Sequence, residues 1–172
     1  MFKRDRVMIS FTAFLNFLGL TLAFPVFIPL MAPDGGLLPP EYSKELRGLL
    51  LGFMLGIYPL VQFFTAPILG VISDRLGRKP VLIIAAMGNC VGNIILAAGI
   101  FTHLIWVVVV GRVITGCFSG SLAVTQSAMS DISDASTRSG NFGLMGAMMG
   151  ASLALGPAIG GILSDQTHGT LF

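Results

Sequence analysis

Two long runs without a charged residue most constrain what this chain can fold into. They cover residues 48–72 and 80–101, and only the short segment 73–79 separates them. A run of about 20 apolar residues is long enough to cross a bilayer as a helix. The sequence therefore predicts two membrane helices joined by a very short polar loop, in which Gly77 and Pro80 favour a tight turn.

The composition extends this pattern to the whole chain. Of the 172 residues, 54% are hydrophobic and 10% are charged, and the mean hydropathy is +0.87. Soluble domains carry roughly 25% charged residues, so we expect an all-α membrane protein without a large soluble domain. The five predicted spans are residues 7–32, 48–72, 80–101, 104–129 and 142–163.

Lysine and arginine are distributed unevenly between the two predicted sides of the membrane. The side that holds the N-terminus and segment 73–79 carries Lys3, Arg4, Arg6, Arg75, Arg78, Lys79 and Arg138, whereas the other side carries only Lys44 and Arg47. Because an excess of basic residues marks cytoplasmic loops, the sequence predicts a cytoplasmic N-terminus in an inner or plasma cell membrane.

Arg112 is the one charged residue well inside a predicted span. Burying an arginine in a membrane is costly, by at least ~2.5 kcal/mol at a helix centre, so its side chain should face the helix bundle or a watery cavity. The alternative is that it reaches the nearby outer surface. Gln62, Asn89, Asn93 and Gln126 are further polar residues in spans, which either line a cavity or bond between helices.

The last span is rich in glycine. Gly146 and Gly150, and again Gly156 and Gly160, are four residues apart. This spacing exposes bare backbone on one helix face and favours close helix packing. The two cysteines, Cys90 and Cys117, lie in apolar runs without a surrounding Cys/His cluster, so we expect packing roles and no metal site.

Several motifs together resemble the major facilitator superfamily. The segment from Gly70 through Asp74, Arg75, Gly77 and Arg78 to Lys79 is similar to the cytoplasmic loop signature between the second and third helices of that family. The fourth span resembles the family's fourth-helix motif in Arg112 and Gly116. The fifth resembles the exporter motif in Gly143, Gly156, Pro157, Gly160 and Gly161. The nearest likeness is to drug and tetracycline-type proton antiporters.

The resemblance implies a fold and a set of functional residues. The chain would supply five helices of the six-helix N-terminal bundle, ending before the sixth, and the C-terminal half of the transporter would be a partner. Asp74 with its loop motif, and Asp131 in the next cytoplasmic loop, would form a conformational latch. Arg112, Gly116, Asn16 and Gln62 would serve proton coupling or line the cavity. A plainer interpretation of Asp74 is that it ends a helix at the membrane surface.

Two positions depart from the tetracycline exporters. Those proteins carry an acidic residue where this chain has Asn16, and another near Gly92. The resemblance therefore does not extend to tetracycline as the substrate or to the usual proton site.

The leading functional prediction is export of small, partly apolar compounds, driven by protons and requiring no cofactor. Uptake of a metabolite by symport is an alternative within the same family. A third possibility is a non-transporting fragment or partner subunit. An enzyme and a nucleic-acid-binding protein are both unsupported, because the sequence shows no paired carboxylates, nucleophile motif or phosphate loop.

Overall fold

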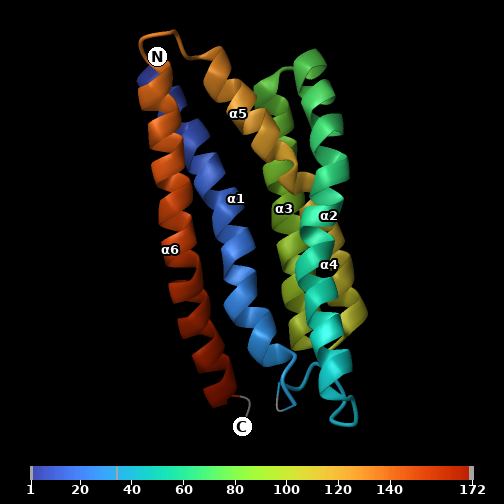
Figure 1. The fold of residues 1–172 in the computed structure, drawn as a ribbon. Coiled ribbons are helices and arrows are strands. Elements are labelled where there is room, and N and C mark those ends of the chain that lie inside the picture. The colour runs from blue at the N-terminus through green and yellow to red at the C-terminus, as the bar shows by residue number, and fades with distance from the viewer. Residues whose placement is uncertain (1, 34, 171–172) are drawn as a thin grey trace.

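A computed structural model describes residues 2–33 and 35–170, with side chains from residue 5 to residue 162 apart from residue 34. Within these ranges the fold is entirely helical, as predicted (Figure 1). The helices are α1 (Phe2–Leu30), α2 (Lys44–Leu76), α3 (Arg78–Phe101), α4 (Ile105–Ser119), α5 (Ser121–Asp131) and α6 (Arg138–Thr170).

Five segments of the described chain are long and apolar enough to cross a membrane, which confirms the predicted number of spans. α4 and α5 together form one of them, from Ile105 to Asp131. The span predicted over 104–129 thus corresponds to a single membrane-spanning segment, in which the helix is interrupted at Gly120. A Cβ atom at Gly120 would lie 2.8 Å from the Ala66 Cα atom of α2. The break therefore falls where the chain passes closest to α2.

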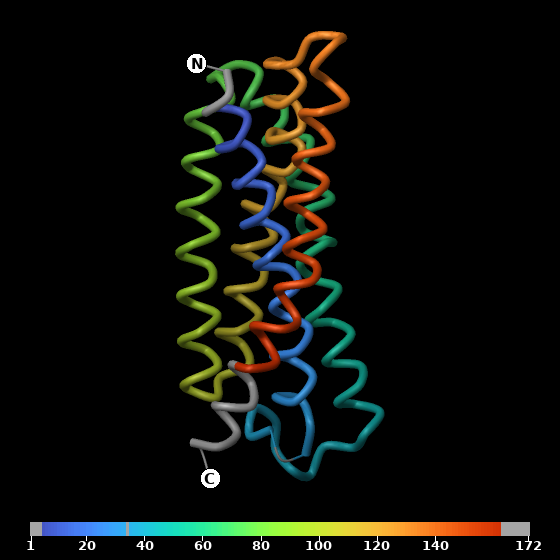
Figure 2. The backbone as a smooth tube through the Cα atoms, turned by 90° about the vertical axis from the view of Figure 1, so that its left-hand side faces the viewer, coloured from blue at the N-terminus to red at the C-terminus, as the bar shows by residue number. Residues whose placement is uncertain are grey.

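The five spans run alternately up and down, and α4 and α5 together form one of them. Both views place the start of α1, the α2–α3 junction and the α5–α6 connection at one end of the bundle (Figures 1 and 2). The α1–α2 and α3–α4 connections lie at the other end. The connections that carry most of the basic residues thus share one end, as the charge distribution predicted.

Helix α1 packs mainly against α6, and α4 packs against both α3 and α2. Glycines set the closest of these contacts. A Cβ atom at Gly92 of α3 would lie 2.9 Å from the Thr115 nitrogen of α4, and one at Gly111 of α4 would lie 2.7 Å from the Leu96 nitrogen of α3. Bare backbone at these positions lets the two helices approach within van der Waals contact.

The α1–α2 connection forms a cap over one end of the bundle. Leu37 and Leu38 of this connection are buried in a cluster that also contains Phe27, Met54 and Val108. A long connection rarely buries two leucines unless it is folded back on the helices. This connection is thus part of the packed core at that end.

Arg47 lies inside α2, although the predicted span begins at residue 48. It is only 5% exposed, and its guanidinium donates hydrogen bonds to four main-chain carbonyls of the α1–α2 connection. The acceptors are Met31, Ala32, Pro39 and Tyr42. Since an irregular connection leaves carbonyls without helical partners, this one arginine satisfies much of the cap's backbone.

Candidate functional site: a charged helix junction and a polar cavity

The α2–α3 junction is shorter than predicted. The sequence indicated a loop over residues 73–79, but α2 continues to Leu76, α3 begins at Arg78, and Gly77 alone separates them. Gly77 has a φ of 92°, a backbone conformation that favours glycine. Charged residues such as Arg78 and Lys79 are good helix formers. The charged segment therefore indicated where the chain reaches the membrane surface, but it did not indicate where the helices end.

Arg78 joins three polar side chains at this junction. Its Nε donates to Asp131 Oδ2 at 2.9 Å, its Nη1 donates to Ser73 Oγ at 2.7 Å, and it forms an ion pair with Asp74. The junction is thereby tied to the C-terminal end of α5, which carries Asp131. The Asp74 and Asp131 side chains are 62% and 56% exposed. Ion pairs this exposed stabilise by at most about 1 kcal/mol, and the free face of Asp74 can meet another group.

The other residues of the loop motif lie around this cluster. The Gly70 carbonyl accepts a hydrogen bond from Ser73 Oγ at 2.8 Å. Arg75 and Lys79 are exposed and make no ion pair within the described part of the chain. Their positions at the end of the bundle suit basic residues that fix membrane orientation.

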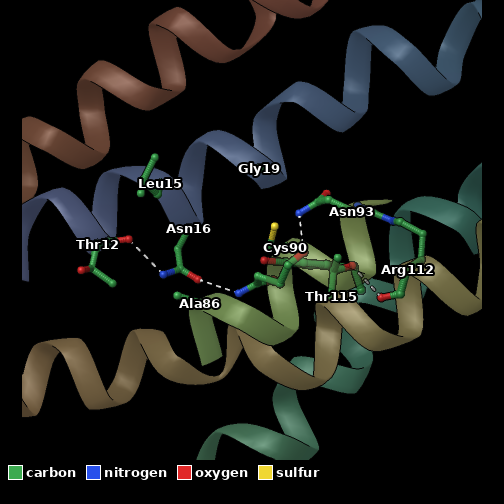
Figure 3. Close-up of a pocket in the computed structure, with 11 residues that line it drawn as sticks. Thr12, Leu15, Asn16, Gly19, Ala86, Cys90, Asn93, Arg112 and Thr115 are labelled. Carbon is green, nitrogen blue, oxygen red and sulfur yellow. Dashed lines mark hydrogen bonds between the residues drawn. The ribbon is translucent and has the colours of Figure 1, made fainter. Parts of the chain in front are cut away.

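A cavity of about 330 Å³ lies between α1, α2, α3 and α4 (Figure 3). Eleven residues line it, and they are Thr12, Leu15, Asn16, Gly19, Tyr58, Ala86, Asn89, Cys90, Asn93, Arg112 and Thr115. The volume is at the lower end of the range for small-molecule sites. Apolar walls with a few polar groups suit a small amphipathic ligand.

Asn16 connects three helices beside this cavity. Its Nδ2 donates to the Thr12 carbonyl at 3.0 Å (Figure 3). Its Oδ1 accepts long hydrogen bonds from Asn89 Nδ2 at 3.5 Å and Ser121 Oγ at 3.4 Å. These bonds link α1 to α3 and α5. An amide can both donate and accept, so Asn16 can exchange one of these partners for a ligand.

Arg112 points into the bundle and is 2% exposed, so the alternative that it reaches the outer surface is wrong. Its Nε donates to the Met54 carbonyl at 3.2 Å, and its guanidinium carbon lies 5.2 Å from the Phe27 ring centroid and 4.9 Å from that of Tyr58. Cation–π contacts of this kind compensate part of the desolvation. The buried Nη2 has no acceptor among the described residues.

Gln62 and Gly116 lie outside the cavity lining. Gln62 Nε2 donates to the Ser119 carbonyl at 3.3 Å, which ties α2 to α4. A Cβ atom at Gly116 would lie 3.0 Å from both the Tyr58 carbonyl oxygen and Val61 Cβ. The structure therefore places these two residues at the α2–α4 contact, next to the cavity wall.

The glycines of α6 fall into two groups. A Cβ atom at Gly156 or Gly160 would collide with Thr21 or Pro25 of α1, whereas one at Gly143 or Gly161 would meet no described atom. Pro157 follows Gly156 directly, inside a continuous helix. The exporter-like motif thus contributes one close helix contact and one face that is open in the described part of the chain.

Helical periodicity could have identified more of the cavity from the sequence. Thr12, Leu15, Asn16 and Gly19 are at positions i, i+3, i+4 and i+7, which share one helix face. Ala86, Asn89, Cys90 and Asn93 repeat the same spacing on α3. Polar residues on such a face, inside an apolar span, are the signal that was available.

The sequence profile of the Major Facilitator Superfamily matches residues 9–170 of the chain. The chain belongs to the Major Facilitator Superfamily. Its match covers nearly all of the described residues, and membership of this transporter family agrees with the prediction that the chain is not an enzyme. The five apolar helices and the family together identify a multi-pass membrane protein.

Individual superfamily members give a finer comparison. The class C tetracycline resistance protein of Escherichia coli is 34% identical over 157 residues, which cover 91% of this chain and 37% of that protein. The class H tetracycline resistance protein of Pasteurella multocida is 39% identical over 114 residues, which cover 66% of this chain and 28% of that protein. The quinolone resistance protein NorA of Staphylococcus aureus is 31% identical over 161 residues, which cover 92% of this chain and 38% of that protein. The chain thus matches less than two fifths of the length of each of these relatives.

Proposed function

We propose that this chain supplies most of the first half of a secondary active exporter of small, partly apolar compounds. The observation that carries this proposal is the cavity between α1, α2, α3 and α4, with polar groups in its apolar wall, in a member of a transporter family. Relatives that are named for tetracycline or quinolone resistance support export as the direction. Transporters of this kind alternate access to a site near the membrane midplane by rocking two halves. A C-terminal half would therefore be the partner of this chain.

We further propose that export is coupled to protons and that the N-terminus is cytoplasmic. The predicted spans contain no Asp or Glu, and the described cavity lining contains none either. We therefore expect the group that carries the proton to lie outside this lining. The cytoplasmic orientation is supported by the basic residues that gather at one end of the bundle.

The Asp74 cluster is the proposed latch of one access state. A carboxylate at a helix N-terminus gains from the helix dipole by typically ~0.3–1 kcal/mol. Asp74 is bound to Arg78 on one side and is largely exposed on the other, so it can accept a helix N-terminus from the second half. Asp131 would contribute indirectly, by holding Arg78 in place.

Filling the cavity tests the proposed function. Gly19 lines the cavity, and a Cβ atom there would meet no atom within 4 Å, so Gly19→Leu can occupy ligand space without a backbone collision. Gly140→Leu is the matched control, because Gly140 has the same open surroundings at the exposed start of α6. Both variants are made in the complete transporter that contains this chain, in an efflux-deficient strain.

The measured quantity is energy-dependent export of a panel of fluorescent compounds that includes a quinolone. We expect Gly19→Leu to abolish export and Gly140→Leu to retain it at equal expression. Export by Gly19→Leu at the unmodified rate would show that the cavity is not on the transport path. Export by residues 1–172 alone would contradict the need for a second half.

A further inference from the structure

Among the described residues that line the cavity, one is charged, and its charge is positive. Arg112 is the only ionised side chain among the described residues that line it, and every Asp and Glu of the chain lies outside the predicted spans. A cation in a membrane interior is normally paired with an anion or with backbone carbonyls. Arg112 has one carbonyl, that of Met54, and no carboxylate.

The unsatisfied donor adds direction to this charge. A guanidinium has five N–H donors in a planar fork that matches a carboxylate. The Phe27 and Tyr58 rings lie near the guanidinium and compensate its charge, but they accept no N–H bond of ordinary strength. The buried Nη2 therefore has no acceptor among the described residues. Leaving a buried charged donor unpaired is unfavourable. Because Arg112 belongs to the cavity lining, a small shift of its guanidinium toward the cavity would let an oxygen of an occupant accept this bond.

Neighbouring groups in the lining fit the rest of such a ligand. Thr115 and Asn93 offer a hydroxyl and an amide beside the same cavity, while Leu15, Ala86 and the Tyr58 ring supply apolar wall. Aromatic rings pack well against such walls. A ring that bears a carboxylate would match both parts of the lining.

We propose that this cavity selects an organic anion, with an aromatic carboxylate bound to Arg112. This inference rests on the proposed function, because it names the substrate class of the same cavity. It also separates this chain from relatives that, by the resemblance, carry an acidic residue at the position of Asn16.

Cys90 provides a readout inside the cavity. Its thiol is exposed and lines the cavity, whereas Cys117 is half-buried and does not. In purified residues 1–172 carrying Cys117→Ser, alkylation of Cys90 by N-ethylmaleimide reports occupancy. The probes are 2-naphthoate, its neutral analogue 2-naphthamide and the cation 2-naphthylmethylammonium. A chain with Cys90→Ser and Cys117 retained is the control for effects outside the cavity.

We expect naphthoate to protect Cys90 at a concentration at least about tenfold lower than naphthamide, because a charge-assisted fork is stronger than neutral hydrogen bonds. Naphthylmethylammonium should not protect, and Cys117 should be unaffected by any probe. Arg112→Gln should remove the preference for naphthoate, and Arg112→Lys should keep part of it. If Arg112→Gln does not fold, the comparison of the three probes on the chain that retains Arg112 still tests the preference for an anion.

Equal protection by naphthoate and naphthamide, a preference for the cation, or no protection by any probe would each overturn the anion inference. The first two outcomes would leave the proposed exporter intact, because the cavity would still bind ligands. Protection by naphthoate, together with a complete transporter that exports nothing, would support the inference and reject the proposed export.

Discussion

Removal of the Arg47 guanidinium should open the cap at one end of the bundle. Arg47 donates to the carbonyls of Met31 at 3.1 Å, Ala32 at 2.9 Å and Tyr42 at 3.2 Å, and also to that of Pro39. A hydrogen bond to a charged group contributes about 1.5–3 kcal/mol. Four such bonds would give several times that value, but desolvation of the buried guanidinium offsets much of it. Arg47→Ala removes the charge and leaves carbonyls without this donor, which costs about 1–3 kcal/mol for each carbonyl that stays buried and unpaired.

We therefore expect Arg47→Ala to lower the free energy of unfolding by about 3 kcal/mol, because water can reach some of the freed carbonyls. For a chain of this size, 1 kcal/mol corresponds to roughly 2–4 °C in Tm, so Tm should fall by about 6–12 °C. Arg47→Lys should lose about half as much, since one ammonium cannot reach all four carbonyls. Thermal unfolding of residues 1–172 in detergent, followed by circular dichroism, measures both. If the Tm of Arg47→Ala lies within about 2 °C of that of the parent, the proposed role of Arg47 in stabilising the cap is refuted.

Three further outcomes follow from the same structure. For a cytoplasmic N-terminus, an impermeant thiol reagent should label a cysteine at Ser43 but not one at the exposed Lys79 in intact cells, and the reverse would overturn the orientation. Asp74→Asn should shift the complete transporter toward its inward-open state by up to about thirtyfold, if the latch contact is worth ~2 kcal/mol, and unchanged accessibility of an outer-vestibule cysteine would favour a simple helix end. Gly156→Leu should destabilise the α1–α6 contact by about 3 kcal/mol in thermal unfolding, whereas Gly146→Leu, which meets open space, should have no effect.

The apolar pattern predicted the spans well because span length and hydropathy are local properties. It could not predict the helix ends, since Lys44 and Arg78 are polar residues that nevertheless begin helices. It also gave no sign of the break at Gly120, which lies close to α2, a segment about fifty residues earlier in the chain. Contacts of that kind depend on how helices pack and leave no local signal.

The candidate site was predictable only in part. The cost of a buried arginine correctly indicated that Arg112 faces the bundle. In the sequence, Arg47 served only as a signal of membrane topology, whereas in the structure it donates hydrogen bonds to four main-chain carbonyls. Gln62 and Gly116 were predicted near the cavity, and they lie at the α2–α4 contact beside it. Which face of a span is lined by cavity and which by a neighbouring helix depends on helix rotation, and the residue types alone do not determine that.

The accessibility of Cys90 from each side of the membrane tests the central claim most directly. A cavity on an alternating-access path is open to one side at a time and, over many cycles, to both. The complete transporter with Cys117→Ser is treated with an impermeant thiol reagent, in intact cells and in inside-out vesicles, and the form that retains only Cys117 is the control. We expect Cys90 to be labelled from both sides and Cys117 from neither. Labelling of Cys90 from only one side, or from neither, would contradict the assignment of this cavity to a transport pathway.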